Sequence, residues 1–134
     1  MISEGVIFGP TGRVASRFTA EMQGDWHQGG GTLLESFTYA GGGGQNREWI
    51  ISDTGPGRFT ATAADILGEA TGEYDGAALR MRYRLRLDAD AGGYILDVTD
   101  WLYLAPDGTI LNKSEMRKFG IKVAELVATI RPAD

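Results

Sequence analysis

The stretch ALRMRYRLRLD, residues 78–88, alternates strictly between apolar and basic side chains from Leu79 to Leu87. The apolar positions are Leu79, Met81, Tyr83, Leu85 and Leu87. The basic positions are Arg80, Arg82, Arg84 and Arg86. Successive side chains of a β-strand point to opposite faces, so the pattern predicts a strand with one buried face and one solvated face. A row of arginines is unexpected in a chain whose formal net charge is −5.

The same period of two recurs along the chain, and clusters of glycine, proline and aspartate mark the turns between periodic runs. The strands expected on this pattern cover residues 4–8, 13–26, 32–39, 46–53, 58–65, 78–88 and 94–104. Residues 66–76 carry regularly spaced glycines, which indicate a weak strand or a bend.

The last third of the chain allows two interpretations. Several apolar residues follow helical spacing, with Ser114 as a candidate N-cap: Met116, Phe119, Val123, Leu126 and Val127. Against a helix, Gly120 would lie in its middle at a cost of about 1 kcal/mol. We therefore favour two strands, over 110–120 and 121–131.

The chain of 134 residues is expected to form one domain over its whole length, 1–134. About eight to ten short antiparallel strands must close or stack to protect their edges. The expected fold is all-β, a single antiparallel meander β-barrel, and a β-sandwich is the second choice.

Pairing 78–88 with 94–104 defines what the arginine row faces. In the register where the residue numbers of paired residues sum to 181, Arg84 lies opposite Asp97, Arg80 opposite Trp101, and Met81 opposite Asp100. The arginines then face outward, with cross-strand ion pairs and a guanidinium over an indole. The alternative is a recognition strip for an anion or a protein partner, formed by Arg80, Arg82, Arg84 and Arg86.

Three carboxylates fall on the inward set of positions: Glu35, Asp65 and Asp100. An isolated buried carboxylate is costly, so each needs a partner. Arg47 is the best cationic candidate and Lys118 the next. The competing interpretation places these acids at strand ends facing water, and we favour it for Asp65, which is next to a turn.

A barrel interior that mixes aromatic and charged groups is typical of a ligand cavity. We expect polar contacts from Glu35, Arg47, Asp100 and Lys118. Apolar walls would come from Phe37, Trp49 and Tyr83. The expected ligand is small and partly apolar, and an anionic head group would suit it, because arginine binds carboxylate or phosphate groups. The alternative is a non-enzymatic interaction barrel with a filled core.

Other functions are less well supported. The net charge of −5 argues against nucleic-acid binding, which needs a basic surface. There are no cysteines, and the one histidine, His27, precedes a glycine loop, so no metal site, cofactor or catalytic residue is expected. An enzyme that uses Glu35 and Asp100 as a general acid and a general base is the third hypothesis. No apolar run reaches the length of a membrane span, and residues 1–14 show no signal peptide, so we expect a soluble chain, cytoplasmic or, if trimmed, periplasmic.

Several segments, in the same order, resemble a family of bacterial proteins of unknown function, many of whose members are described as lipoproteins. These segments are RFTAEMQGDW, LLESFTYAGG followed by REWIIS, FTATAADILGEATG, DWLYLAPDGTILNKSEM and KFG. The family's signature positions correspond here to Glu35, Arg47, Trp49, Asp65, Gly68, Gly72, Asp100, Trp101, Asn112 and Lys118.

The resemblance implies a calycin-like barrel, similar to lipocalins and fatty-acid-binding proteins, and no established activity. This chain departs from the lipoprotein members because it shows no signal segment or acylation cysteine. It also begins near what would be the end of the family's first strand. The resemblance therefore implies a barrel with an open seam near residues 1–8.

Overall fold

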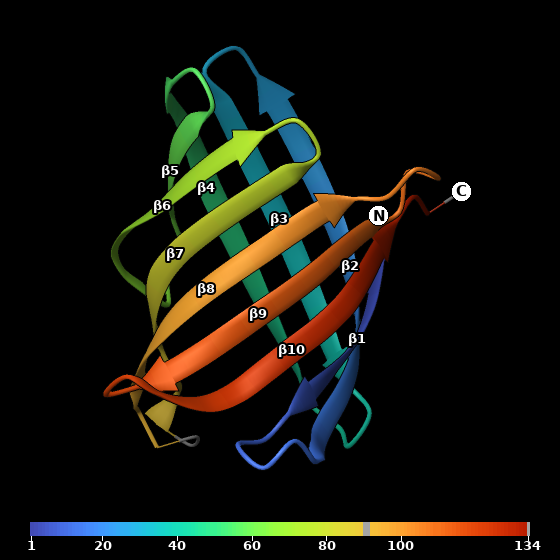
Figure 1. The fold of residues 1–134 in the computed structure, drawn as a ribbon, viewed down its shortest axis with the longest axis vertical. Coiled ribbons are helices and arrows are strands. Elements are labelled where there is room, and N and C mark those ends of the chain that lie inside the picture. Colours follow the sequence, from blue (N-terminus) through green and yellow to red (C-terminus); the bar gives the residue numbers. More distant parts are fainter. Residues whose placement is uncertain (90–91, 134) are drawn as a thin grey trace.

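The structure is a computed structural model that describes residues 1–89 and 92–133. Its ten strands form a closed antiparallel barrel in which each strand pairs with the next along the chain and the last pairs with the first (Figure 1). The strands are β1 (Ile2–Phe8), β2 (Val14–His27), β3 (Gly30–Tyr39), β4 (Gly44–Gly55), β5 (Arg58–Thr62), β6 (Ile66–Asp75), β7 (Ala78–Arg86), β8 (Ile95–Leu104), β9 (Ile110–Lys118) and β10 (Ile121–Arg131). The predicted all-β meander barrel is confirmed, and the sandwich was wrong.

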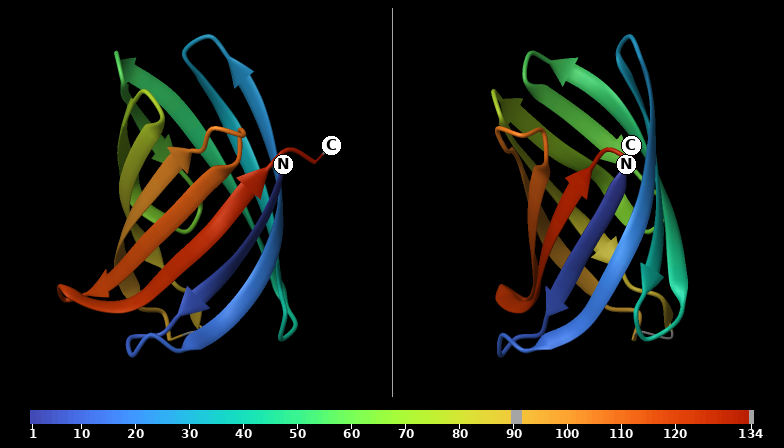
Figure 2. Two further views of the ribbon diagram at one scale, coloured as in Figure 1. Left: turned by 45° about the vertical axis from the view of Figure 1, so that its right-hand side comes forward. Right: turned by 90° about the vertical axis from the view of Figure 1, so that its right-hand side faces the viewer.

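The expected open seam near residues 1–8 is wrong. β1 pairs along its whole length with β10 on one side and with β2 on the other. Ile2, for example, lies opposite both Arg131 and Glu21. The first and the last strand consequently lie side by side (Figure 2). With β1 in place, its backbone polar groups are paired and no sheet edge remains there.

The last third of the chain forms β9 and β10, so the two-strand prediction is confirmed. Phe119 and Gly120 connect them with φ values of 52° and 80°. A two-residue hairpin turn of this kind needs positive φ at both positions, which glycine adopts without strain. Gly120 therefore forms a turn rather than interrupting a helix.

The glycine-spaced segment 66–76 is a bulged strand. β6 loses register with β7 between Leu67 and Thr71, where Gly68 has a φ of 65°. Four residues on, a Cβ at Gly72 would overlap the ring of Phe59 on the neighbouring strand. The glycines thus bend β6 and make room for an aromatic side chain. β5 is shorter than predicted and ends at Thr62.

The predicted register between β7 and β8 is confirmed: Arg84 pairs with Asp97, Arg80 with Trp101, and Met81 with Asp100. The arginines face outward. The predicted stacking of Arg80 on Trp101 is wrong, because Arg80 bonds Glu73 of β6 instead. The Trp101 ring lies under Lys113 of β9, whose Nζ is 5.6 Å from the ring centroid.

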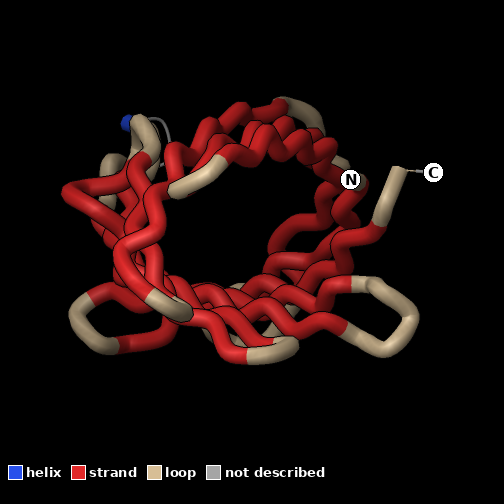
Figure 3. The backbone as a smooth tube through the Cα atoms, turned by 90° about the horizontal axis from the view of Figure 1, so that it is seen from above, coloured by secondary structure: helices blue, strands red, loops and turns tan. Residues whose placement is uncertain are grey.

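Viewed from above, the strands form a flattened ring (Figure 3). Two apolar clusters line its opposite walls. The larger one, on β4 to β8, contains the buried residues Trp49, Ala61, Ile66, Ala70, Leu85, Leu96 and Val98. The smaller one, on β2 and β10, contains Phe18, Ala20 and Ala128. The space between these walls holds the charged inward side chains.

Candidate functional site

A cavity of about 380 Å³ lies inside the barrel, with walls that combine aliphatic and aromatic side chains with a few polar groups. Six of the seven predicted site residues line it: Glu35, Phe37, Arg47, Trp49, Tyr83 and Asp100. Lys118 does not. It is the last residue of β9, and its Nζ lies 3.5 Å from the centroid of the Tyr94 ring. Lys118 has the inward parity but is the last residue of its strand, so the structure does not bring it together with the polar group of the cavity.

Strands β3 and β4 position the central side chains. Alternation directs Glu35 inward, and the register places Arg47 directly opposite it. Trp49 follows two residues after Arg47 and therefore points to the same side. One hairpin thus presents an acid, a guanidinium and an indole to the cavity.

The Arg47 side chain is already bonded by an acid of the protein. Its Nη2 donates to Asp65 Oδ2 at 2.9 Å, and its Nε donates to Asp65 Oδ1 at 3.1 Å. This is the two-point geometry that arginine and a carboxylate favour. Burial acts to lower the pKa of Arg47, but the bonds to Asp65 and the nearby negative groups outweigh it, so the pKa is raised.

Asp65 is a further residue whose favoured sequence interpretation differs from the structure. It lies in the turn before β6, as expected, but it faces Arg47 instead of open water, and its side chain is 23% exposed. Gln45 adds a second donor, with Nε2 3.2 Å from Asp65 Oδ2, and the hydroxyl of Tyr39 donates to Gln45 Oε1 at 3.3 Å. The parity of β4 offered a signal for Gln45, because it lies two residues before Arg47.

Glu35 is buried beside two donors. The Trp49 Nε1–H donates to Glu35 Oε1 at 3.0 Å, and Arg47 Nη1 lies 3.8 Å from the same oxygen. Burial raises the pKa of Glu35, and Arg47 and Trp49 only partly oppose that effect. The carboxyl group therefore holds its proton to a higher pH than an exposed glutamate does.

Asp100 forms a second buried pair with Tyr83. The Tyr83 hydroxyl donates to Asp100 Oδ2 at 2.9 Å. Oδ1 of Asp100 is buried and accepts no hydrogen bond from the described residues. Burial raises the pKa of Asp100, although Ser114, opposite it on β9, and Tyr83 act to lower it. Burial and the negative charge of Asp100 hold the pKa of Tyr83 well above its usual value.

The aromatic side chains surround these charges. The Arg47 guanidinium carbon lies 5.9 Å from the Phe37 ring centroid and 5.8 Å from that of Trp49. The Trp49 and Tyr83 rings meet edge to face, with centroids 5.2 Å apart. Within residues 1–89 and 92–133, no group of three or more His, Cys, Asp or Glu could hold a metal ion. The arrangement can bind and orient a small molecule by hydrogen bonds, charge and aromatic contact.

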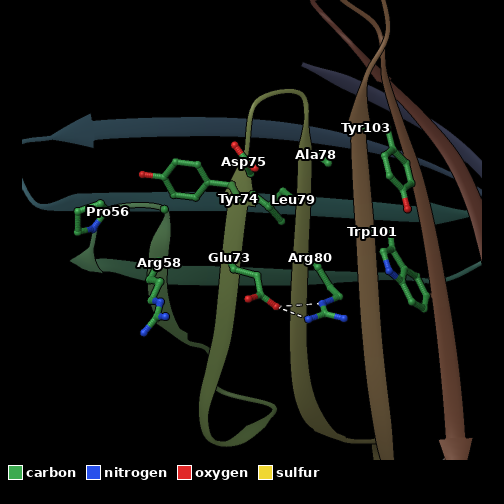
Figure 4. Close-up of a pocket in the computed structure, with 11 residues that line it drawn as sticks. Pro56, Arg58, Glu73, Tyr74, Asp75, Ala78, Leu79, Arg80, Trp101 and Tyr103 are labelled. Carbon is green, nitrogen blue, oxygen red and sulfur yellow. Dashed lines mark hydrogen bonds and ion pairs between the residues drawn. The ribbon is translucent and has the colours of Figure 1, made fainter.

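A second hollow, of about 400 Å³, lies on the rim between β5 and β8 (Figure 4). Arg80 of β7 bonds Glu73 of β6 across it, and Trp101 and Tyr103 of β8 form its far side. This rim groove adjoins the outward arginine row. It shares only Leu79 with the lining of the internal cavity.

No helix in the described part of the chain is long and apolar enough to cross a bilayer. No curated protein and no solved structure matches the sequence. A family model described as "Protein of unknown function (DUF3833)" matches residues 1–132. Because that match covers nearly the whole chain, the protein belongs to the DUF3833 family.

Proposed function

We propose that the barrel binds a small, partly apolar molecule in its interior. The observation that carries this proposal is the cavity of about 380 Å³, which falls in the range of ligand pockets, about 300–1,000 Å³. If each non-hydrogen atom takes about the 30 Å³ of a liquid water molecule, the cavity holds about a dozen such atoms. Calycin-like barrels such as lipocalins use their interior in this way.

The lining supports the same proposal. Glu35, Arg47 and Asp100 supply a few fixed polar groups, and Phe37, Trp49 and Tyr83 supply aromatic surface. Such a mixture orients a ligand through its polar end and holds it through its apolar body. An internal space of this volume supports the ligand hypothesis over the alternative of a filled core.

Native mass spectrometry of gently extracted protein tests the proposal. We expect a mass above that of the 14.4 kDa chain, which disappears under denaturing conditions. Ala61 is buried on the cavity wall, so Ala61→Leu adds three carbon atoms to the cavity. This variant should fold and lose the bound mass.

Ala15→Leu is the matched control, because it adds the same atoms at an exposed position of β2. It should keep the bound mass. The proposal fails if neither protein carries a ligand and no small amphiphile binds the wild type in calorimetry.

The outer face of β7 supports a second candidate function, the docking of an acidic protein segment. Exposed arginines adjoin the rim groove with its Trp101 and Tyr103 side chains. Arginine, tryptophan and tyrosine are the residues enriched at the energetic centres of protein interfaces.

Reversing charge on the arginine row separates the two functions. Arg82→Glu with Arg84→Glu should abolish capture of a partner protein and leave binding inside the barrel unchanged, because both side chains point outward. Loss of small-molecule binding in a folded double variant would contradict the cavity proposal instead.

A further inference from the structure

We propose that the ligand of the internal cavity presents a cationic amine, not an anionic head group, to Glu35 and Asp100. This inference rests on the proposed function and names the chemical class of its ligand. It replaces the expectation of an anionic head group, which depended on a free Arg47.

Asp65 neutralises the charge of Arg47 and takes one of the two-point faces of its guanidinium. Three of its donor contacts, from Nε and Nη2, go to the two oxygens of Asp65. Its remaining nitrogen, Nη1, faces Glu35 Oε1 at 3.8 Å. The N–H groups left on Nη1 and Nη2 can still donate to a ligand carboxylate, but Asp65 already neutralises the charge of the guanidinium, and such a ligand would compete with Glu35 for Nη1.

The charges of the lining favour a cation. The pair of Arg47 and Asp65 is neutral, so Glu35 and Asp100 remain as the acids that face the cavity. Oδ1 of Asp100 is buried and accepts no well-formed hydrogen bond from the described residues, although the Ser114 hydroxyl acts on the same carboxyl group. In their ionised forms these two acids repel an anion, whereas an ammonium group favours those ionised forms and supplies both charge and hydrogen-bond donors.

The aromatic groups next to these acids suit a cation as well. Trp49 donates its N–H to Glu35 and lies edge to face with Tyr83, which in turn bonds Asp100. Acids combined with aromatic ring faces are the environment that binds ammonium groups in proteins.

Amine binding should release protons. Burial raises the pKa of both Glu35 and Asp100, and a bound cation favours their ionised forms. The charged and hydrogen-bonding groups around the two acids are Arg47, Asp65, Trp49, Tyr83 and Ser114. Affinity for the amine should therefore rise with pH over the range in which the two carboxyl groups ionise.

Calorimetry with three probes of equal chain length tests the inference: octylamine, 1-octanol and octanoate at about pH 7. All three fit the cavity volume by the count given above. We expect octylamine to bind at least about tenfold more tightly than octanoate, with 1-octanol between them. The amine should also show a heat that varies with the ionisation enthalpy of the buffer.

The outcomes distinguish the two proposals. If 1-octanol binds and octanoate binds as tightly as octylamine or more tightly, the cavity is a ligand site but the amine inference is overturned. If none of the three probes binds, the proposed function itself fails, and the inference fails with it.

Matched variants locate the effect. Asp100→Asn should weaken octylamine binding about tenfold and change 1-octanol binding by less than about threefold. Asp97→Asn removes an equal charge from the outer face of the same strand and should change neither. Equal losses in both variants would show that octylamine responds to general charge, which contradicts the inference.

Asp65→Asn should reverse the preference, because it frees the Arg47 guanidinium for an anion. Octanoate should then bind at least as tightly as octylamine. If this variant does not fold, the comparison of Asp100→Asn with Asp97→Asn decides the question. A folded Asp65→Asn variant that still rejects octanoate would show that Asp65 is not what keeps anions out.

Discussion

Two arginine–aspartate pairs of the barrel have the same chemistry and opposite surroundings. Inside, Arg47 bonds Asp65 at 2.9 Å and its side chain is 13% exposed. Outside, Arg84 bonds Asp97 at 3.2 Å and its side chain is 68% exposed. Water screens the outer pair and competes for its hydrogen bonds, whereas the inner charges depend on each other. The contribution of an ion pair to stability and ligand choice is therefore set by its position in the barrel.

The largest effect should come from breaking the inner pair. Arg47→Ala leaves Asp65 and Glu35 without their guanidinium, and removing one partner of a buried pair costs about 3–5 kcal/mol. Urea unfolding should show this loss at about pH 7. A loss below about 1 kcal/mol would mean that the interior around Arg47 is wet enough to solvate the remaining acids.

Arg82→Ala is the control for this comparison. Arg82 is exposed on the outer face of β7, opposite Thr99. A surface substitution of this kind changes the unfolding free energy by about 0.5 kcal/mol or less. If Arg82→Ala is as destabilising as Arg47→Ala, the contrast between the two faces is wrong.

A smaller effect is expected from removing one hydrogen bond of the inner network. Trp49→Phe keeps an aromatic ring on the wall but deletes the N–H that donates to Glu35. Leaving a buried acceptor without its donor costs about 1–3 kcal/mol. The pKa of Glu35 should also rise further, because the Trp49 bond acts to lower it, and NMR titration of the carboxyl carbon can measure this.

Trp101→Phe makes the same chemical change on the outer face, where Lys113 covers the indole. It should cost less than about 1 kcal/mol and leave the Glu35 titration unchanged. A Glu35 titration that does not move in Trp49→Phe would mean that the indole only fills space.

The two faces should also differ in pH dependence. The pKa of Asp100 is higher in the folded than in the unfolded chain, so the folded state binds more protons between those two values. The free energy of unfolding should therefore fall as pH rises through that window. The contribution of protonated Asp100 to stability is fully present below the ordinary pKa of an aspartate. Asp100→Asn removes this contribution. The free energy of unfolding of the variant should therefore increase relative to that of the wild type as pH rises.

Urea unfolding from about pH 4 to pH 8 measures this difference, and subtraction cancels the titration of the acids that do not interact with Asp100. Glu35 does interact with it, and its contribution has the same sign, because Asp100 raises the pKa of Glu35. Asp97→Asn removes an equal charge from the outer face of the same strand and serves as the control. A wild-type advantage over Asp100→Asn that grows with pH would show that the ionised carboxylate stabilises the fold.

The sequence predicted the two faces of the barrel better than the contacts within it. Period-two alternation assigned Glu35, Arg47, Trp49 and Asp100 to the interior because side-chain parity is a local property of a strand. The β7–β8 register also followed from local pairing, since it aligns apolar with apolar positions across one short loop.

Contacts that depend on barrel closure could not be read in this way. Asp65 meets Arg47 across a turn of the next hairpin, 18 residues away along the chain. Lys118 has the correct parity, but parity does not say how far along the barrel axis a residue lies. The pairing of β1 with β10 joins the two ends of the chain, and only the closed structure brings them together.

The smallest effect should belong to the outer pair, Arg84 with Asp97. A double-mutant cycle of Arg84→Ala and Asp97→Ala should give a coupling energy of about 0–1 kcal/mol, because both side chains are more than half exposed. The coupling should disappear in about 1 M salt, where the screening length falls to about 3 Å. A coupling above that range, or one that resists salt, would mean that a bound partner or a further charge shields the arginine row from water. The row would then have to be treated as a second functional face instead of a solvated one.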